Sequence, residues 1–275
     1  RQFSKLVPMS KSNPNFDFLL NLANNAAVKA GEEILKVYTS DDFGVENKCD
    51  ESPLTKADKA AHYKIVELLE ASNLPILSEE GIEISSDTRS KWDYFWMVDP
   101  LDGTKEFIKR NGEFTVNIAL IHKGVPVIGV VYTPVTRELF YAYDGIGAFK
   151  KDDLGLHKLE VQKIDDLEGL RVVASRSHLN AETQTFMDGL SNPIVVSMGS
   201  SLKFLAIADG KADVYPRYAP TMEWDSAAAH GVCRVLGIEV MDLKTKKEVR
   251  YNKENLLNPY FIVAPSVLLK DLGLK

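Results

Sequence analysis

The sequence predicts a two-lobe protein of mixed structure, with an α+β lobe in residues 15–160 and an α/β lobe in residues 161–275. Three observations predict this fold class. The chain opens with two amphipathic helical patterns, continues with short β-rich segments separated by turn residues, and ends with strands and helices in alternation. Its 275 residues, 45% of them hydrophobic, can fill one large core or two modest ones.

Two helices are expected near the N-terminus, both in the first lobe. Apolar residues between Phe16 and Ile34 recur with the three-and-four spacing of a helix that buries one face. A second pattern of this kind runs from Ala57 to Leu69, after the segment SPLTKAD. Residues 1–14 are polar and aperiodic, and we expect them to form a disordered or leader segment outside the fold.

The first lobe continues with short strands. Strand-like runs occupy residues 75–78 and 94–98, and a longer β-rich segment covers residues 114–134. The dipeptide Lys123-Gly124 divides this last segment and indicates a hairpin, and the run ELFYAYDG adds a further strand. We therefore expect an antiparallel series of strands.

The second lobe begins after a charged stretch without periodicity, residues 150–169, and we place the boundary near residues 155–168. Beyond it, strands and helices alternate. The expected strands are LRVVAS, PIVVSM, ADVYP, EVMDL and FIVAPS, and the expected helices are NAETQTFMDGL, SSLKFLAIADG and EWDSAAAHGVCRVLG.

Composition excludes several classes of function. The net charge of −6 and the pI of about 5.5 argue against a broad basic surface for nucleic acid. No apolar run approaches the ~18 residues of a membrane span, and no signal-peptide pattern is present. Cys49 and Cys233 lie far apart, which fits a reducing compartment. We predict a cytoplasmic protein without integral membrane association; peripheral association and oligomeric state stay open.

The segment DPLDGT follows the aromatic strand that ends at Val98. Asp99 and Asp102 can converge on one cation or bridge two, and a helix after them would place the backbone N–H groups of Gly103 and Thr104 at its first turn. Such N–H groups favour a phosphate. Taken alone, the two aspartates are more typical of a turn or a helix N-cap than of a metal site.

Three other acidic segments accompany this one. Glu79 and Glu80 follow a short apolar strand, Asp225 opens a helix rich in small residues, and Asp58 lies in TKAD. Each has an ordinary alternative as a solvated loop or a helix-start residue. Together they suit hard divalent cations such as Mg²⁺. The sequence has no Cys/His zinc spacing, nucleophile elbow, dinucleotide fingerprint or P-loop.

These motifs carry a family resemblance. WMVDPLDGTKEF, with SEE and TKAD before it and EWDSAAAH after it, resembles the inositol monophosphatase superfamily of metal-dependent, lithium-sensitive phosphatases, over nearly the whole chain from Phe16. The segments KEF, SRSHLN and GSSLKFLAIADGKADVYPR resemble its 3′(2′),5′-bisphosphate nucleotidases. The resemblance implies a layered αβαβα, sugar-phosphatase-like fold, with the site in the cleft between the lobes.

The resemblance also implies a metal site for two or three Mg²⁺ ions. Thr104, oriented by Asp58, would position and deprotonate the attacking water, and Glu80 is counted with them as catalytic. We assign metal binding to Glu80 and an outer hydrogen-bonding position to Glu79, although the two residues alone do not decide this order. The implied metal ligands are Glu80, Asp99, Asp102, Asp225 and the backbone carbonyl of Leu101.

For the substrate, the resemblance points to a small phosphorylated nucleotide. An anionic ligand would account for Lys203, a cation at a helix start. The implied activity is hydrolysis of the 3′-phosphate of adenosine 3′,5′-bisphosphate, a by-product of sulfate-group transfer, to AMP and phosphate. An inositol or other sugar phosphatase, and a catalytically silent nucleotide- or metal-binding protein, are the alternatives. The implied substrate-binding residues are Gly103, Thr104, Ser175, His178, Gly199, Lys203 and Asp225.

Overall fold

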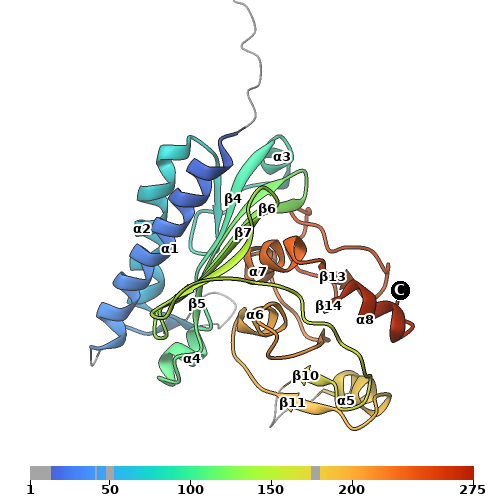
Figure 1. The fold of residues 1–275 in the computed structure, drawn as a ribbon. Helices are drawn as coiled ribbons and strands as arrows, with labels where there is room; N and C mark the ends of the chain where they lie inside the picture. The colour runs from blue at the N-terminus through green and yellow to red at the C-terminus, as the bar shows by residue number, and fades with distance from the viewer. Residues whose placement is uncertain (1–13, 41, 48–52, 175–179) are drawn as a thin grey trace, which may run out of the picture.

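The computed structural model describes residues 14–40, 42–47, 53–174 and 180–275. Figure 1 shows a large sheet with a pair of helices on one face, further helices on the other face, and a smaller sheet beyond these. Within the described ranges, no helix is long and apolar enough to cross a membrane.

The helical pair consists of α1 (Phe16–Tyr38) and α2 (Lys56–Leu69), as the periodicity predicts. Their buried faces pack on each other and on the large sheet. Each helix begins at a side-chain cap. The Asn15 Oδ1 atom accepts the Phe18 N–H at 3.1 Å, and Thr55 caps α2. The short strands β1 (Glu46–Asn47) and β2 (Pro53–Leu54) pair between these two helices in the chain.

In the part of the chain that the structure describes, the large sheet has seven strands in sequence order, and only the first pair is parallel. The expected antiparallel series is confirmed, but two corrections apply. The second strand runs through Asp99 to Asp102 instead of ending at Val98. The stretch 150–169, expected to be irregular, supplies part of two further strands. The strands are β3 (Ile76–Ser78), β4 (Tyr94–Asp102), β5 (Thr115–His122), β6 (Val125–Thr133), β7 (Glu138–Tyr143), β8 (Gly147–Asp152) and β9 (Gly155–Lys158).

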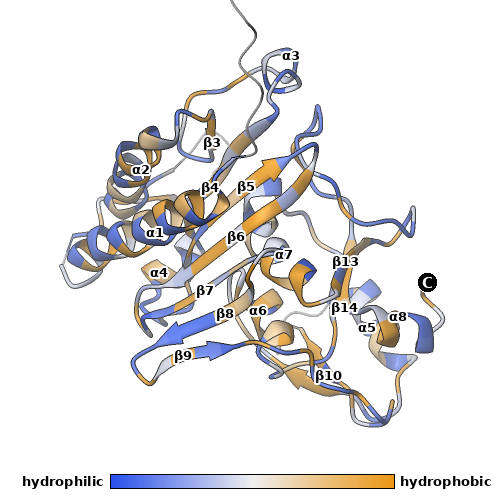
Figure 2. Ribbon diagram, turned by 45° about the horizontal axis from the view of Figure 1, so that its top comes forward, coloured by the Kyte–Doolittle hydropathy of each residue, from blue (hydrophilic) through white to orange (hydrophobic). Residues whose placement is uncertain are grey.

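Figure 2 explains why the last two strands escape a search for apolar periodicity. The central strands β5 and β6 are hydrophobic along their length, whereas β8 and β9 form a hydrophilic edge. All four residues of β9 are exposed. A strand with no buried face leaves no alternation in the sequence.

The second half of the chain alternates as predicted. Strands β10 and β11 pair in parallel, β14 pairs antiparallel with β12 and β13, and a bridge between Val172 and Val214 connects the two groups. Helix α8 is not among the expected elements, because its six residues are too few to show a helical period. The elements are β10 (Arg171–Val173), α5 (Ala181–Asp188), β11 (Ile194–Val196), α6 (Leu202–Ala208), β12 (Tyr215–Arg217), α7 (Glu223–Val235), β13 (Ile238–Asp242), β14 (Phe261–Pro265) and α8 (Ser266–Asp271). The described residues also form three short helices: the 3₁₀ helix η1 (Glu70–Ser72), α3 (Ser86–Arg89) and α4 (Thr104–Ile108).

The two faces of the smaller sheet enter different cores. On β14, Val263 joins the core formed with α6, α7 and the large sheet, while its neighbours Ile262 and Ala264 join a second core with α5 and α8. This alternation places helices on both sides of the smaller sheet. The layered αβαβα arrangement is therefore confirmed (Figure 1). The division into units 15–160 and 161–275 stays a prediction.

Helix α7 lies directly on the large sheet because both surfaces lack side chains at the crossing point. A Cβ atom on Gly129 of β6 would lie 2.2 Å from the Ala228 carbonyl oxygen and 2.8 Å from the Val232 nitrogen. Gly231 faces Gly129 with similar closeness, at 2.9 Å. The two glycines thus allow backbone-to-backbone packing of the helix that carries Asp225.

Candidate metal centre and substrate cavity

Three carboxylates from three separate segments meet at one end of the large sheet. One ligand oxygen from each of Glu79, Asp99 and Asp225 lies within 4.8 Å of the other two. Parallel pairing of β3 with β4 brings the first two together, and the Glu79 N–H donates to the Val98 carbonyl at 3.0 Å. Asp225 comes from the first turn of α7, on the opposite side of the sheet from α1 and α2.

The glutamate in this group is Glu79, whereas the sequence analysis assigned Glu80. The physical reason is the backbone after β3. Glu79 still bonds to β4 through its N–H, whereas Glu80 lies in the turn that the Gly81 N–H closes on the Ser78 carbonyl at 3.0 Å. Glu80 lies toward α2, where its charge adds to the raising of the Lys59 pKa, behind the larger effect of the Lys59 hydrogen bond to Glu46. Glu79 is therefore the glutamate that lies with Asp99 and Asp225, and direct metal binding by either glutamate stays a prediction.

The turn after Asp99 is held by its own side chain. The Asp99 Oδ1 atom accepts the Leu101 N–H at 3.1 Å, and the Leu101 carbonyl oxygen lies 3.4 Å from the Thr104 hydroxyl oxygen. Gly103 has φ +94°, a left-handed conformation that a residue with a Cβ adopts poorly, and it caps α4. The sequence DPLDGT thus forms a compact turn that faces two acidic residues inward. The roles of Leu101 and Gly103 as metal and phosphate contacts stay predictions.

Burial and mutual repulsion raise the pKa values of the clustered aspartates. The pKa of Asp99 is well above its usual value because of burial and then the charge of Glu79. Burial, and then the charge of Asp102, raises the pKa of Asp225 to about 8. The pKa of Asp102 reaches only about 6, since Lys203 and the Ser201 N–H offset its burial. Such a group of carboxylates is stabilised by a cation that replaces the bound protons.

Thr104 and Asp58 are in contact, as the resemblance implies. The Thr104 hydroxyl donates to Asp58 Oδ1 at 3.1 Å. Asp58 Oδ2 accepts the Thr55 N–H at 2.7 Å and the Thr55 hydroxyl at 2.5 Å, so the carboxylate is fixed by the start of α2. The pair therefore joins the helical layer to the turn of the metal centre. Its catalytic role stays a prediction.

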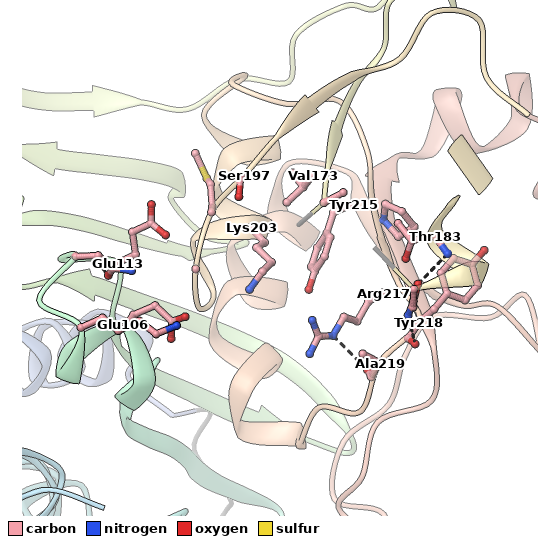
Figure 3. A pocket seen from close by; sticks show the side chains of 17 residues that line it. Glu106, Glu113, Val173, Thr183, Ser197, Lys203, Tyr215, Arg217, Tyr218 and Ala219 are labelled. Carbon is pink, nitrogen blue, oxygen red and sulfur yellow. Dashed lines mark hydrogen bonds between the residues drawn. The ribbon is translucent and has the colours of Figure 1, made fainter. Parts of the chain in front are cut away.

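Two cavities open beside the acidic group. The smaller, about 160 Å³, is lined by Asp102, Gly103, Ser200 and Asp225, among others. The larger, about 560 Å³, lies between the loop after α4 and the smaller sheet (Figure 3). Glu106, Lys203, Tyr215 and Arg217 line both cavities, so the acidic group and the larger cavity share a wall. A volume of this size accommodates a small organic ligand.

Positive charge gathers on the wall formed by α6 and β12, where Lys203 and Arg217 point into the cavity (Figure 3). Lys203 Nζ donates to the Ser200 carbonyl at 3.1 Å, and burial lowers its pKa. The Arg217 Nε atom donates to the Ala219 carbonyl at 3.2 Å. Burial raises the pKa of Tyr215 to about 12, although Arg217 lowers it. An anionic group in the cavity would meet both cations.

The remaining predicted contacts divide into two groups. Gly199 is buried and lines the larger cavity, where an added Cβ would lie 2.9 Å from the Glu113 carbonyl oxygen. Ser175 and His178 lie outside the described residues, so their roles stay predictions.

Sequence reasoning missed two groups of residues at this site. Ser200 has φ +42° and lines the smaller cavity, and its buried hydroxyl has no hydrogen-bond partner among the described residues. Asn117 and Ser201 contact Asp102 from behind. The GSS run was the available signal for the serines, but no local pattern marks Asn117 within β5.

The donor set suits hard divalent cations. Its side-chain ligands are all carboxylate oxygens, and they converge from separate elements. Asp99 is 1% exposed, so water cannot solvate its charge and a cation would stabilise it instead. These are the conditions for a metal-dependent hydrolase, in which ions neutralise a phosphate and promote its hydrolysis.

Comparison with known proteins agrees with this site. The model of the inositol monophosphatase family matches residues 16–272. The 3′(2′),5′-bisphosphate nucleotidase CysQ of Shigella flexneri is 44% identical over 254 residues, which cover 90% of this chain and 98% of that protein. The protein of the same name from Escherichia coli K12 gives the same identity and coverage.

Solved structures give the same result. CysQ from Bacteroides thetaiotaomicron, a bacterial member of the inositol monophosphatase family, matches with a TM-score of 0.83 at 46% identity, covering 92% of this chain and 99% of its own. The extragenic suppressor protein suhB from Bartonella henselae matches with a TM-score of 0.75 at 27% identity, covering 94% and 98%. This chain belongs to the inositol monophosphatase family. The predicted resemblance is thereby confirmed.

Proposed function

We propose that this protein is a 3′(2′),5′-bisphosphate nucleotidase that hydrolyses the 3′-phosphate of adenosine 3′,5′-bisphosphate to AMP and phosphate. The observation that carries the proposal is the 44% identity to proteins of that name over nine-tenths of the chain. The position of the larger cavity supports it as well, because a nucleoside-sized space adjoins the acidic group and carries two cations on its wall.

In this proposal, Glu79, Asp99, Asp102, Asp225 and the Leu101 carbonyl hold the metal ions, with Glu80 outside the direct ligands. We propose Mg²⁺ in two or three positions. Ions held there would neutralise the transferred phosphate and stabilise the departing 3′-oxygen. The chain itself would hold these ligands at fixed positions, because they lie on a strand, the turn after it and a helix.

The proposed water-activating pair is Thr104 with Asp58. Because the Thr104 hydroxyl donates its hydrogen to Asp58, its lone pairs are left to accept a hydrogen bond from the attacking water. As the water reacts, its proton can pass to the threonine oxygen while the threonine proton passes to Asp58. General-base assistance of this kind contributes about 10²- to 10⁴-fold to the rate.

The second phosphate and the nucleoside would occupy the larger cavity. Lys203 and Arg217 are placed to neutralise the 5′-phosphate, and Tyr218 adds an aromatic ring to the lining. Ser175, His178 and Gly199 complete the proposed contacts. Removal of this nucleotide would clear a by-product of sulfate-group transfer from the cytoplasm. Inhibition by Li⁺, as the family resemblance implies, belongs to the same proposal.

The test measures phosphate release from adenosine 3′,5′-bisphosphate, inositol 1-phosphate and fructose 1,6-bisphosphate, each with Mg²⁺ and with a chelator. We expect the highest kcat/KM with the nucleotide and none with the chelator. If inositol 1-phosphate or the sugar bisphosphate is the best substrate, the protein is a sugar phosphatase of the same family. No Mg²⁺-dependent release from any of the three would indicate a silent binding protein and overturn the proposal.

A further inference from the structure

A buried polar cluster lies behind Asp102, away from both cavities. It consists of Thr115 and Asn117 on β5 and Ser201 before α6, and each side chain is at most 1% exposed. The Ser201 hydroxyl donates to Asn117 Oδ1 at 2.8 Å, and the Thr115 and Ser201 hydroxyl oxygens are 2.8 Å apart. We call these three residues the Asn117 triad.

The triad fixes the orientation of the Asn117 side chain. Its Oδ1 atom lies 2.8 Å from the Ser201 hydroxyl and 3.2 Å from the Thr115 hydroxyl, both of which can donate to it. The amide nitrogen must then face the opposite way, where it donates to Asp102 Oδ2 at 3.5 Å. Ser201 also contacts the Asp102 carboxylate, to which its backbone N–H donates. Asp102 is thus held by two donors of the triad.

The triad also holds one wall of the substrate cavities. Residues 199–203 carry Ser200 and Lys203 on the cavity side and Ser201 on the buried side. The same segment packs tightly against the metal-centre turn, because a Cβ on Gly103 would lie 3.3 Å from the Ser200 Cβ. The left-handed φ of Ser200 shows that this close placement is kept despite an unfavourable backbone conformation.

Stability alone does not require such a cluster. Buried hydroxyl and amide groups contribute little net free energy, and replacing a hydrogen-bonded set by apolar side chains of similar shape is often nearly neutral. A requirement remains if Asp102 must be presented at a fixed position. Partners of this kind behind a metal ligand commonly contribute about 10- to 100-fold to metal affinity or activity.

We infer that Asn117 and Ser201 are positioning residues that hold the Asp102 carboxylate and the segment 199–203 in one fixed arrangement, so that metal binding and nucleotide binding depend on the same buried hydrogen bonds. This inference rests on the proposed metal role of Asp102. The expected consequence differs between the two residues. Asn117 bonds to Asp102 and reaches the cavity wall through Ser201, which keeps its bond to Thr115 when Asn117 is replaced. Ser201 itself belongs to both the carboxylate side and the cavity wall.

The test compares Asn117→Ala and Ser201→Ala with the control Thr133→Val. Thr133 is also a buried threonine of the large sheet, 2% exposed, and it lies close to the triad because Tyr132 before it pairs with Val116 of β5. Among the described residues its hydroxyl bonds to Thr136 and Glu138 and to no member of the triad. The first readout is calorimetric titration of the metal-free protein with Mn²⁺ and no nucleotide. We expect about 10-fold or greater weakening in both triad variants and no change in the control.

The second readout is steady-state kinetics at saturating Mg²⁺. Ser201→Ala should raise the KM for adenosine 3′,5′-bisphosphate about tenfold, because the cavity wall loses its anchor, while Asn117→Ala leaves KM within about twofold. Two further variants guard against misfolding. Thr115→Val is isosteric and should weaken Mn²⁺ binding by a smaller factor, and Ser201→Thr keeps the hydroxyl and should bind Mn²⁺ as the unaltered protein does.

Unchanged Mn²⁺ affinity in Asn117→Ala and Ser201→Ala would overturn the inference, as would an equal loss in Thr133→Val. Because the titration contains no substrate, its outcome is independent of the proposed activity. A protein that hydrolyses none of the candidate substrates, but whose triad variants bind Mn²⁺ weakly, would refute the proposed function and support the positioning role.

Discussion

Gly129→Ala adds one methyl group at the point where α7 packs on the large sheet. The substitution should affect the metal centre as well as packing, because α7 carries Asp225. The new Cβ would lie 2.2 Å from the Ala228 carbonyl oxygen, whereas ordinary contact begins at 3.4 Å. The obstructing atoms are backbone atoms, so no rotamer change relieves the clash. The helix must therefore retreat by roughly 1 Å.

Two effects follow from this retreat. The overpacked interface should lower the free energy of unfolding by about 3 kcal/mol, the upper part of the usual range, because a whole helix moves. Metal affinity should fall as well, because Asp225 moves relative to Asp99. Metal–ligand distances must lie within about 0.2 Å of their optimum for tight binding. We expect Mn²⁺ affinity to fall at least tenfold, in line with the loss of one ligand's geometry.

Urea unfolding and Mn²⁺ calorimetry measure the two effects separately. The control is Gly189→Ala, at the end of α5, where φ is −81° and the nearest obstructing atom lies at an ordinary 3.4 Å. That substitution should change the free energy of unfolding by less than about 0.5 kcal/mol. A Gly129→Ala variant that unfolds at the same urea concentration as the control and binds Mn²⁺ equally well would show that the α7 contact does not constrain the metal centre.

Four other outcomes are expected. Thr104→Ala should lower kcat by about 10²- to 10⁴-fold at saturating Mg²⁺, while Thr104→Ser, which keeps the hydroxyl donor to Asp58, should retain most activity; equal kcat for both variants would remove the residue from catalysis. Asp225→Asn should bind metal poorly yet raise the metal-free melting temperature at pH 8 relative to the unaltered protein. The sign follows because its folded pKa, about 8, exceeds its unfolded value of 3.8, so the folded carboxyl loses stability as pH rises between these values; an unchanged melting temperature at pH 8 argues against the repulsion. Arg89→Met should cost about 3 kcal/mol in urea unfolding, because the buried guanidinium donates to Asn252 Oδ1 at 2.7 Å and to three backbone carbonyls; a loss below about 0.5 kcal/mol would show that water replaces these bonds. Chelation should abolish turnover and lower the melting temperature, and added Mg²⁺ should restore both by mass action; melting that does not respond to Mg²⁺ contradicts a metal centre in the folded state.

Strong periodicity made most of the fold predictable. The buried residues of α1 and of the β5–β6 hairpin form apolar patterns that are visible in the sequence. Both elements lie where these patterns predict them. The edge strand β9 is fully exposed, and β8 is partly buried with Ala148 as its one fully buried residue, so residues 147–158 show no apolar alternation. A search for apolar periodicity cannot detect strands of this composition.

The site was predictable to the level of segments but not of single atoms. The DPLDGT turn and the Thr104–Asp58 contact follow from motifs whose residues are close in the chain or known from relatives. The choice between Glu79 and Glu80 depends on where one strand ends, and a shift of one residue reverses the direction of a side chain. The bond between Ser201 and Asn117 joins positions 84 residues apart, beyond any local pattern.

The central layer of helices serves two sheets at once. The core of α6 and α7 continues without interruption from Met97 of the large sheet to Val263 of the smaller one. Separation of the two sheets would expose this apolar core to water, at a free-energy cost comparable with that of unfolding. We therefore expect the proposed nucleotide to enter and its products to leave without separation of the two sheets, so that the scaffold around the carboxylates keeps its shape.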